Sequence, residues 1–231
     1  MESIKENYKE ISEQVNRAAR KAGKNPRDIT LIAVSKKKDI SVVREGIESG
    51  IFHLGENYIQ EAVDKIGQLS HYNEVTWHFI GHLQSNKARF AVQYFDLIHT
   101  VDSYKLAREI NKQAAKHGKR QHILLQVNIG HESSKSGTDI TAIIDLARQV
   151  SVLENISVQG LMCMPPYFQD PEMARPFFRH LAQLRDEIMD LNLENIAMTH
   201  LSMGMSNDFM VAIEEGATLV RVGTAIFGER I

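Results

Sequence analysis

The sequence is poor in cysteine and has no long apolar run: Cys163 is the only cysteine among 231 residues. A single cysteine excludes an intrachain disulfide framework and a zinc site built from cysteines, and it suits a reducing compartment. The amino terminus has no apolar signal segment, and no stretch approaches the roughly 20 apolar residues that a membrane span needs. We therefore expect a cytoplasmic protein that makes no use of a membrane.

An excess of charge of either sign is also missing. The 27 Lys and Arg residues nearly balance the 29 Asp and Glu residues, for a formal net charge of −2. This balance gives no overall attraction to nucleic acid or to an anionic membrane. Neither a Walker-type phosphate loop nor a dinucleotide glycine fingerprint occurs, so nucleotide-dependent enzymes find no support. The expected partner is a small molecule.

What the chain does have is a regular alternation of apolar runs with amphipathic segments. The chain opens with apolar residues at spacings of three and four over residues 4–22, which predicts an amphipathic helix. Eight strand-like runs follow, at residues 29–35, 51–54, 76–80, 97–101, 122–127, 158–163, 197–201 and 218–222. Strands that alternate with helices pair in parallel through right-handed crossovers, and eight such units can close into a barrel.

We predict an α/β fold, a single (β/α)8 TIM barrel in which the opening helix takes the place of the missing eighth outer helix. A doubly wound open sheet is the alternative that periodicity leaves open. No internal repeat, low-complexity tract or Gly/Ser linker marks a boundary, so residues 1–231 are expected to form one domain.

The first strand-like run ends on Lys36, where a parallel sheet exposes its carboxyl edge. Burial disfavours the charged form of a lysine and makes its amine a better nucleophile toward an aldehyde. Lys36 is therefore a candidate for a Schiff base. The alternative is that Lys36, Lys37 and Lys38 form a solvated basic loop.

Two anion-binding loops are expected after the seventh and eighth strands, where barrels often bind phosphate. In the first loop, Ser206 or Asn207 is expected to cap the following helix, whose free N–H groups attract an anion. In the second, Gly223 allows a close approach to the backbone. Arg221 interrupts the eighth apolar run, and a buried guanidinium needs acceptors, either in a structural ion pair or in a ligand.

A single ligand with an aldehyde, a phosphate and a ring acceptor would satisfy Lys36, the two loops and Arg221 together. Pyridoxal 5'-phosphate has all three. A sugar-phosphate isomerase on the same barrel would explain the two loops but not Lys36 with Arg221.

Five stretches also resemble the YggS/PROSC family of pyridoxal phosphate homeostasis proteins, which is similar to the N-terminal barrel of bacterial alanine racemase. They are residues 33–36, 55–61, 77–87, 200–206 and 220–228. The resemblance runs from the first strand to the carboxyl terminus. It implies a barrel that lacks the C-terminal β-domain of alanine racemase.

The resemblance also implies roles for individual residues. Lys36 would form the internal aldimine with pyridoxal phosphate, Arg221 would face the pyridine nitrogen, and Asn57 would lie near the ring. The remaining cofactor-binding positions are expected around the phosphate or close to it, through backbone or side chain: Ser202, Met203, Gly204, Ser206, Gly223 and Thr224.

The expected function is to bind, store or deliver the cofactor in vitamin B6 homeostasis, with pyridoxal-phosphate-dependent apoenzymes as possible recipients, and the expected state is a monomer. An arginine cannot donate its proton to the pyridine nitrogen, which weakens the ring as an electron sink. We assign no catalytic residue. The alternative is an amino-acid racemase or related enzyme whose second acid/base is His82, His200 or Tyr58.

No metal site is expected. His78 and His82 are four residues apart, which is about 13 Å along an extended strand and too far for a shared metal.

Overall fold

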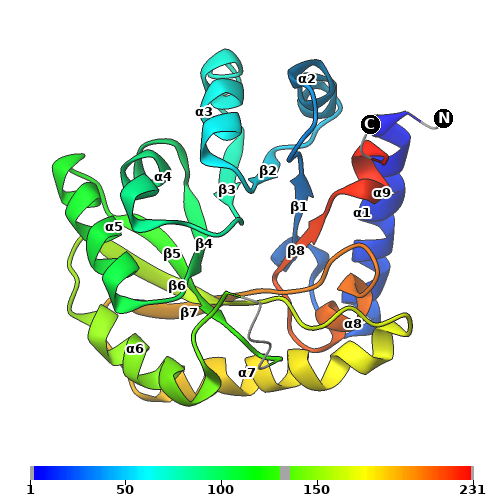
Figure 1. Ribbon diagram of the computed structural model, residues 1–231. Helices are drawn as coiled ribbons and strands as arrows, with labels where there is room; N and C mark the ends of the chain where they lie inside the picture. The colour runs from blue at the N-terminus through cyan, green and yellow to red at the C-terminus, as the bar shows by residue number, and fades with distance from the viewer. Residues whose placement is uncertain (1–2, 131–135, 230–231) are drawn as a thin grey trace.

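Eight parallel strands close into a barrel in the computed structural model, which describes residues 3–130 and 136–229 (Figure 1). Closure is shown by the first strand, which pairs with both the second and the eighth: Ala33 lies opposite Leu54 on one side and Val222 on the other. The open-sheet alternative is therefore wrong, and the barrel is confirmed. The strands are β1 (Thr30–Val34), β2 (His53–Glu56), β3 (Thr76–Phe79), β4 (Leu97–Val101), β5 (Gln121–Val127), β6 (Ile156–Cys163), β7 (Ile196–Ser202) and β8 (Leu219–Val222).

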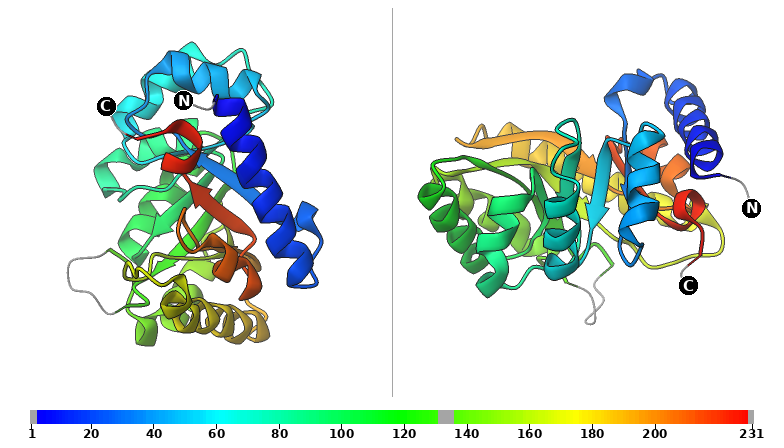
Figure 2. Two further views of the ribbon diagram at one scale, coloured as in Figure 1. Left: turned by 90° about the vertical axis from the view of Figure 1, so that its right-hand side faces the viewer. Right: turned by 90° about the horizontal axis from the view of Figure 1, so that it is seen from above.

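Helices alternate with these strands and cover the outside of the barrel (Figure 2). They are α1 (Ile4–Lys21), α2 (Ile40–Glu48), α3 (Ile59–Gln68), α4 (Ala88–Tyr94), α5 (Tyr104–Lys116), α6 (Ile143–Ser151), α7 (Arg175–Asp190), α8 (Phe209–Glu214) and α9 (Thr224–Phe227). Short 3-10 turns lie at Pro26–Asp28, Ser85–Lys87, Ile140–Ala142 and Pro171–Ala174. None of the helices in the described part of the chain is long and apolar enough to cross a membrane.

The opening helix α1 has the place that the sequence predicts. Ser3 and Glu6 form a capping box that satisfies free N–H groups at its start. Its buried face, which includes Ile11 and Val15, packs against α8 and α9 beside β8. The left view of Figure 2 shows α1 lying along this side of the barrel. It covers the flank that an eighth outer helix would otherwise cover.

The second strand begins two residues later than its apolar run suggests. Ile51 is fully buried, but its N–H bonds to the carbonyl of Gly46, so Ile51 belongs to the turn after α2. The strand instead continues through Gly55 to Glu56, whose carboxylate is buried beside Lys65. The predicted strand therefore ended two residues too early, because the apolar pattern did not include the buried Glu56.

Polar residues share the interior of the barrel with a small apolar cluster. Barrel interiors are normally filled by branched apolar side chains. Here Ile32, Leu97, Leu124, Met162 and Leu219 form a cluster separate from the main core between strands and helices. His78, His99, Ser202 and Arg221 are buried on the strands that surround it.

Candidate functional site

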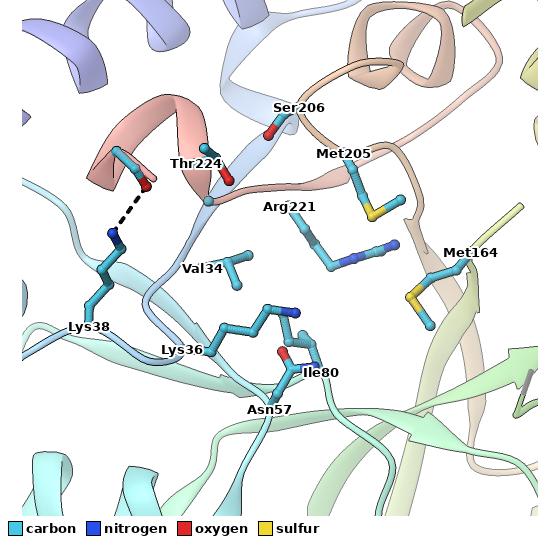
Figure 3. Close-up of a pocket in the computed structure, with 12 residues that line it drawn as sticks. Val34, Lys36, Lys38, Asn57, Ile80, Met164, Met205, Ser206, Arg221 and Thr224 are labelled. Carbon is cyan, nitrogen blue, oxygen red and sulfur yellow. Dashed lines mark hydrogen bonds between the residues drawn. The ribbon is translucent and has the colours of Figure 1, made fainter. Parts of the chain in front are cut away.

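One pocket lies at the carboxyl ends of the strands and is lined by segments from both ends of the chain (Figure 3). Its residues come from the last residue of β1, from β8, from the start of α9 and from the loops after β1, β2, β3, β6, β7, β8 and α9. They are Val34, Lys36, Lys38, Asn57, Ile80, Met164, Met205, Ser206, Arg221, Gly223, Thr224 and Gly228. Six of the nine cofactor-binding positions expected from the sequence are thus brought together: Lys36, Asn57, Ser206, Arg221, Gly223 and Thr224.

The loop that holds Lys36 is fixed on both sides of that residue. Before it, the hydroxyl of Ser35 donates to Oε1 of Glu56 at 2.7 Å, and the carbonyl of Ser35 accepts from Nζ of Lys65 at 2.7 Å. After it, the backbone N–H of Lys37 donates to Oε1 of Glu61 at 2.5 Å. Lys65 also bonds to both carboxylates, so one buried ammonium joins the two clamps.

Opposing effects act on the pKa of the buried carboxylate in this clamp. Burial raises the pKa of Glu56 above its ordinary value, and the charge and hydrogen bond of Lys65 and the hydroxyl of Ser35 offset only part of that rise. Oε2 of Glu56 has no hydrogen-bond partner among the described residues. The clamp therefore depends on Lys65, because a buried carboxylate without its cation is costly.

Only Lys36 of the three consecutive lysines points its amine into the pocket between Asn57 and Arg221 (Figure 3). The ammonium of Lys37 lies 5.8 Å from the ring centroid of Tyr58, and the Lys37 side chain is exposed. Lys38 lines the edge of the pocket, but its Nζ donates to the carbonyls of Gly228 at 3.0 Å and Glu229 at 2.6 Å. The lysines are therefore not one solvated loop.

Arg221 enters the pocket from the opposite side and is only 4% exposed. One guanidinium nitrogen donates to Oγ of Ser202 at 2.6 Å and another to the carbonyl of Cys163 at 3.0 Å. No carboxylate forms a salt bridge with Arg221 within the described chain. Burial lowers the pKa of Arg221, but a guanidinium stays charged in proteins. The structural ion pair that the sequence left open is absent there: the two hydrogen-bond partners of the cation are neutral, and the carboxylate of Asp208 acts on it only through its charge.

Another wall of the pocket is formed by the hydroxyls of Ser206 and Thr224 and by the main chain at Gly223. The side chains of Ser206 and Thr224 both line the pocket (Figure 3), and neither hydroxyl has a hydrogen-bond partner in the part of the chain that the structure describes. Gly223 between them and Val34 presents main chain to the cavity. This wall offers donors without offering a competing carboxylate.

The expected helix cap in this loop is wrong. The cap position of α8 is Asp208, and its side chain makes no capping hydrogen bond. Oδ1 of Asp208 instead accepts from the N–H of Met205 at 2.6 Å, while Asn207 donates to the carbonyl of Phe168 at 2.9 Å. The turn folds back on itself before the helix starts, which leaves Ser206 exposed at the pocket.

Three expected cofactor-binding residues do not line the pocket. Ser202 is fully buried behind Arg221, and Met203 is fully buried in the core. Gly204 has a φ of +90°, and its carbonyl accepts from the N–H of Arg221 at 3.0 Å. A Cβ on Gly204 would lie 2.6 Å from Cβ of Ala212. These residues bond to β8 and to Arg221 itself, and Gly204 allows the tight turn toward α8.

The sequence did not single out the apolar walls. Val34, Ile80, Met164 and Met205 line the pocket, and Lys38 closes its edge. Met164 follows β6 directly, as Ile80 follows β3. Their positions just after strand ends, where barrels place their sites, were a usable signal.

The three proposed second acid/base residues lie in different places. His82 is exposed, bonds to the hydroxyl of Ser136 at 3.1 Å, and lines a neighbouring cavity of about 360 Å³. Tyr58 is 49% exposed and does not line the pocket. His200 bonds to Thr218 and lines a cavity formed by the first residues of several strands, at the other end of the barrel. Within the described ranges, no three His, Cys, Asp or Glu side chains are arranged to hold a metal ion.

The donor set fits an anionic, aromatic aldehyde. The buried guanidinium of Arg221 and the two unpartnered hydroxyls can donate hydrogen bonds to an anion or to an atom with a lone pair. The methionines and Val34 form an apolar wall against which a ring can pack. The amine of Lys36 faces the same space. Pyridoxal phosphate has each of the complementary groups.

Comparison with known proteins agrees with this geometry. Residues 3–231 match the family described as "Alanine racemase, N-terminal domain". The "Pyridoxal phosphate homeostasis protein" of Aquifex aeolicus is 42% identical over 225 residues, which cover 97% of each chain. That of Escherichia coli K12 is 38% identical over 239 residues, which cover 100% of this chain and 98% of its relative.

Among solved structures, PipY of Synechococcus elongatus with PLP bound superposes with a TM-score of 0.81 at 36% identity, over 93% of this chain and 100% of PipY. The chain therefore belongs to the family of pyridoxal phosphate homeostasis proteins, which is built on the alanine racemase N-terminal domain.

Proposed function

We propose that this protein binds pyridoxal 5'-phosphate in the pocket at the carboxyl ends of the strands and takes part in intracellular vitamin B6 homeostasis. The amine of Lys36 condenses with the aldehyde carbon, so that a C=N bond forms and one water molecule leaves. The observation that supports this most directly is that Lys36, Arg221 and the turn at Gly223 and Thr224 line one cavity.

The pocket has a different group for each part of the ligand. Arg221, held by Ser202 and the carbonyl of Cys163, donates to the unprotonated pyridine nitrogen. Ser206, Gly223 and Thr224 receive the phosphate, and Asn57 lies beside the ring. Ser202, Met203 and Gly204 support these contacts from behind.

Relatives of two kinds support the ligand. The curated homologues that cover nearly the whole chain are named pyridoxal phosphate homeostasis proteins, and the PipY structure contains PLP. We infer the same ligand for this chain. We further propose that residues 1–231 act as one cytoplasmic barrel, as a monomer, and release the cofactor to pyridoxal-phosphate-dependent apoenzymes.

A holding role fits the pocket better than catalysis does. A guanidinium at the pyridine nitrogen leaves that nitrogen unprotonated, which makes the ring a poor electron sink. Racemisation also needs bases on both faces of the substrate α-carbon. His200 lies at the other end of the barrel and Tyr58 lies outside the pocket, so neither supplies the second base.

His82 keeps a racemase as the second candidate. It lines the cavity that shares Asn57, Ile80, Met164 and Met205 with the main pocket. Incubation of the protein and pyridoxal phosphate with each enantiomer of common amino acids in deuterated water decides between the two. We expect no exchange of the α-proton above a Lys36→Ala control; exchange that depends on Lys36 and His82 would favour the enzyme.

The binding proposal is tested by borohydride reduction of the protein with pyridoxal phosphate, followed by mass spectrometry of its peptides. We expect one pyridoxyl group on Lys36, a yellow protein before reduction, and loss of the label in Lys36→Ala. Lys38→Ala is the matched control, because Lys38 also lines the pocket but is bonded to Gly228 and Glu229. A full label in Lys36→Ala would move the site to Lys37 or Lys38.

A further inference from the structure

Three imidazoles form a hydrogen-bonded line through the interior of the barrel and end at the cofactor pocket. Nδ1 of His53 lies 3.1 Å from Nε2 of His78, and Nδ1 of His78 lies 3.0 Å from Nε2 of His99. Nδ1 of His99 then lies 2.8 Å from Oγ of Ser202, which accepts from Arg221. The three histidines stand on the neighbouring strands β2, β3 and β4, whereas Ser202 and Arg221 stand on β7 and β8. The line therefore joins the two sides of the barrel.

Burial favours the neutral form of all three imidazoles. His99 is fully buried and His78 is 3% exposed. Burial lowers the pKa of His99 well below its ordinary value and lowers that of His78 to about 3, and the neighbouring imidazoles lower both further. Burial also lowers the pKa of the half-buried His53, although the charge of Asp96 works in the opposite direction. A neutral imidazole has one donor nitrogen and one acceptor nitrogen, so all three rings must point the same way along the line.

Arg221 decides which way that is. A guanidinium only donates, so Oγ of Ser202 is an acceptor in its bond with Arg221. The single hydrogen of this fully buried hydroxyl is then available to Nδ1 of His99. In the reverse direction Nδ1 of His99 would donate, and the Ser202 hydrogen would have no acceptor among the described contacts. A buried donor without an acceptor is costly, so the first direction is favoured.

A neutral line has a consequence for the pocket. A carboxylate in the place of Ser202 would also bind Arg221 but would neutralise its charge. An aliphatic side chain in the place of His99 would not affect that charge, but it would leave the hydroxyl of Ser202 without its second hydrogen-bond partner. The imidazole fixes the guanidinium through Ser202 and keeps its positive charge for the pocket.

We propose that His99 is a positioning residue for Arg221, acting through Ser202, and that His53, His78 and His99 all bear their hydrogen on Nε2. The first part rests on the proposed function, because it concerns how Arg221 meets pyridoxal phosphate. The second part does not depend on the ligand, because it concerns only the hydrogen positions on the three imidazoles.

The direction of the line is tested on the protein without pyridoxal phosphate, by 15N NMR of the imidazoles at pH 7.5 with assignment by single His→Gln variants. We expect His53, His78 and His99 to be neutral with the hydrogen on Nε2. A hydrogen on Nδ1 of His99, or a doubly protonated ring, would overturn the proposed direction whatever the protein binds.

The positioning role is tested with two variants of nearly equal shape. In His99→Asn the side-chain oxygen stands close to the place of Nδ1 and accepts from Ser202, whereas His99→Leu has no acceptor; both lose the donor toward His78. We expect His99→Leu to bind pyridoxal phosphate about tenfold more weakly than His99→Asn, the loss of one well-placed hydrogen bond. His200→Gln is the control, because His200 is a barrel imidazole bonded to Thr218 and outside the line.

Urea unfolding of the same variants separates positioning from stability. Both His99 variants are expected to lose stability, because both leave His78 without its partner, and His99→Leu loses more, because it also leaves the buried hydrogen of Ser202 without an acceptor. Only His99→Leu is expected to lose affinity and to shift the absorption maximum of the bound cofactor. Equal affinities and equal spectra would contradict the positioning role. Failure of the wild-type protein to bind pyridoxal phosphate would instead contradict the proposed function and leave the NMR result standing.

Discussion

At the scale of single residues, Arg221 shows how a costly buried charge becomes a binding group. Its two hydrogen-bond acceptors, Ser202 and the carbonyl of Cys163, are neutral and buried. They satisfy the geometry of the guanidinium without removing its charge. A ligand with a lone pair or negative charge that binds this cation stabilises the folded protein, because the unfolded chain has no such site.

Arg221→Ala is therefore expected to lower both stability and affinity. The truncation leaves Oγ of Ser202 and the Cys163 carbonyl without their donor, at about 1–3 kcal/mol for each unsatisfied buried group. Thermal unfolding and titration with pyridoxal phosphate measure the two effects. Arg221→Lys is the comparison, since it keeps the charge but cannot reach both acceptors in one plane. An unchanged melting temperature and spectrum in Arg221→Ala would contradict the buried position of this side chain.

At the scale of elements, the loop after β1 is held by α3 rather than by its own sequence. Glu61 and Lys65 stand one turn apart on α3 and bond to the backbone on the two sides of Lys36. Glu56 at the end of β2 accepts from the hydroxyl of Ser35 and from Lys65. Lys37 has a φ of +58°, a conformation that is unfavourable for a lysine. The clamp compensates for this local strain.

Lys65→Met is expected to cost about 3–5 kcal/mol of unfolding free energy, because it leaves the buried carboxylate of Glu56 without its cation. The double variant Glu56→Gln, Lys65→Met removes the charge as well and should recover at least about 1 kcal/mol of that loss. Urea unfolding of both variants measures the difference. A double variant no more stable than the single one would show that Glu56 is not ionised in the folded protein.

Gly204 makes a second element-scale prediction. Its φ of +90° is unfavourable for any other residue, and an added Cβ would lie only 2.6 Å from Cβ of Ala212, so there is no room for a side chain. Gly204→Ala is expected to destabilise the protein by about 1–3 kcal/mol and to shift the turn that ends at Ser206. The stability is measured by urea unfolding, with Gly67→Ala on α3 as the control, because a Cβ there meets nothing within 4 Å. Equal stability of the two variants would contradict the tight turn.

At the scale of the whole molecule, the neutral imidazole line makes stability depend on pH. His78 and His99 have folded pKa values below the ordinary 6.5, so the unfolded chain binds more protons than the folded one as the pH falls through that value. Their contribution is complete above pH 6.5 and is lost progressively toward pH 3, the folded value for His78. The raised pKa values of Glu56 and Asp208 act in the opposite direction, since the folded carboxyls gain protons first.

Between pH 6.5 and 5.5 we expect each buried imidazole to reduce the unfolding free energy by about 1 kcal/mol, so about 2 kcal/mol for His78 and His99 together. Urea unfolding at the two pH values measures this. His99→Asn should have a smaller dependence than the wild-type protein, because it removes one of the two imidazoles. A profile that is the same in the wild-type protein and in His99→Asn would contradict the lowered pKa of His99.

The fold was largely accessible from the sequence because it depends on patterning along the chain. Alternating apolar and amphipathic runs located all eight strands and the opening helix to within a few residues. The largest shift, at β2, arose where the buried pair Glu56 and Lys65 replaced apolar side chains. Hydropathy does not register a buried charge pair, because its partner lies on another element.

The site was accessible in part. Lys36 and Arg221 could be chosen because their charge conflicts with their position beside or in an apolar strand. Gly223 followed from the expected phosphate loop after the eighth strand, and Thr224 from the family resemblance. Ser202, Met203 and Gly204 were expected around the ligand but stand behind Arg221. Side chains alternate between the two faces of a strand, and sequence adjacency alone does not say which residues of a turn face the cavity.

Local patterns along the chain are enough to predict the order of strands and helices, the lysine at the end of the first strand and the arginine inside the last. The pairing of β1 with β8, the contact of Lys65 with the loop of Lys36, and the line of imidazoles that leads through Ser202 to Arg221 arise from tertiary contacts. Closing a barrel brings residues more than a hundred positions apart into hydrogen-bond contact, and no local pattern in the chain encodes such a distance.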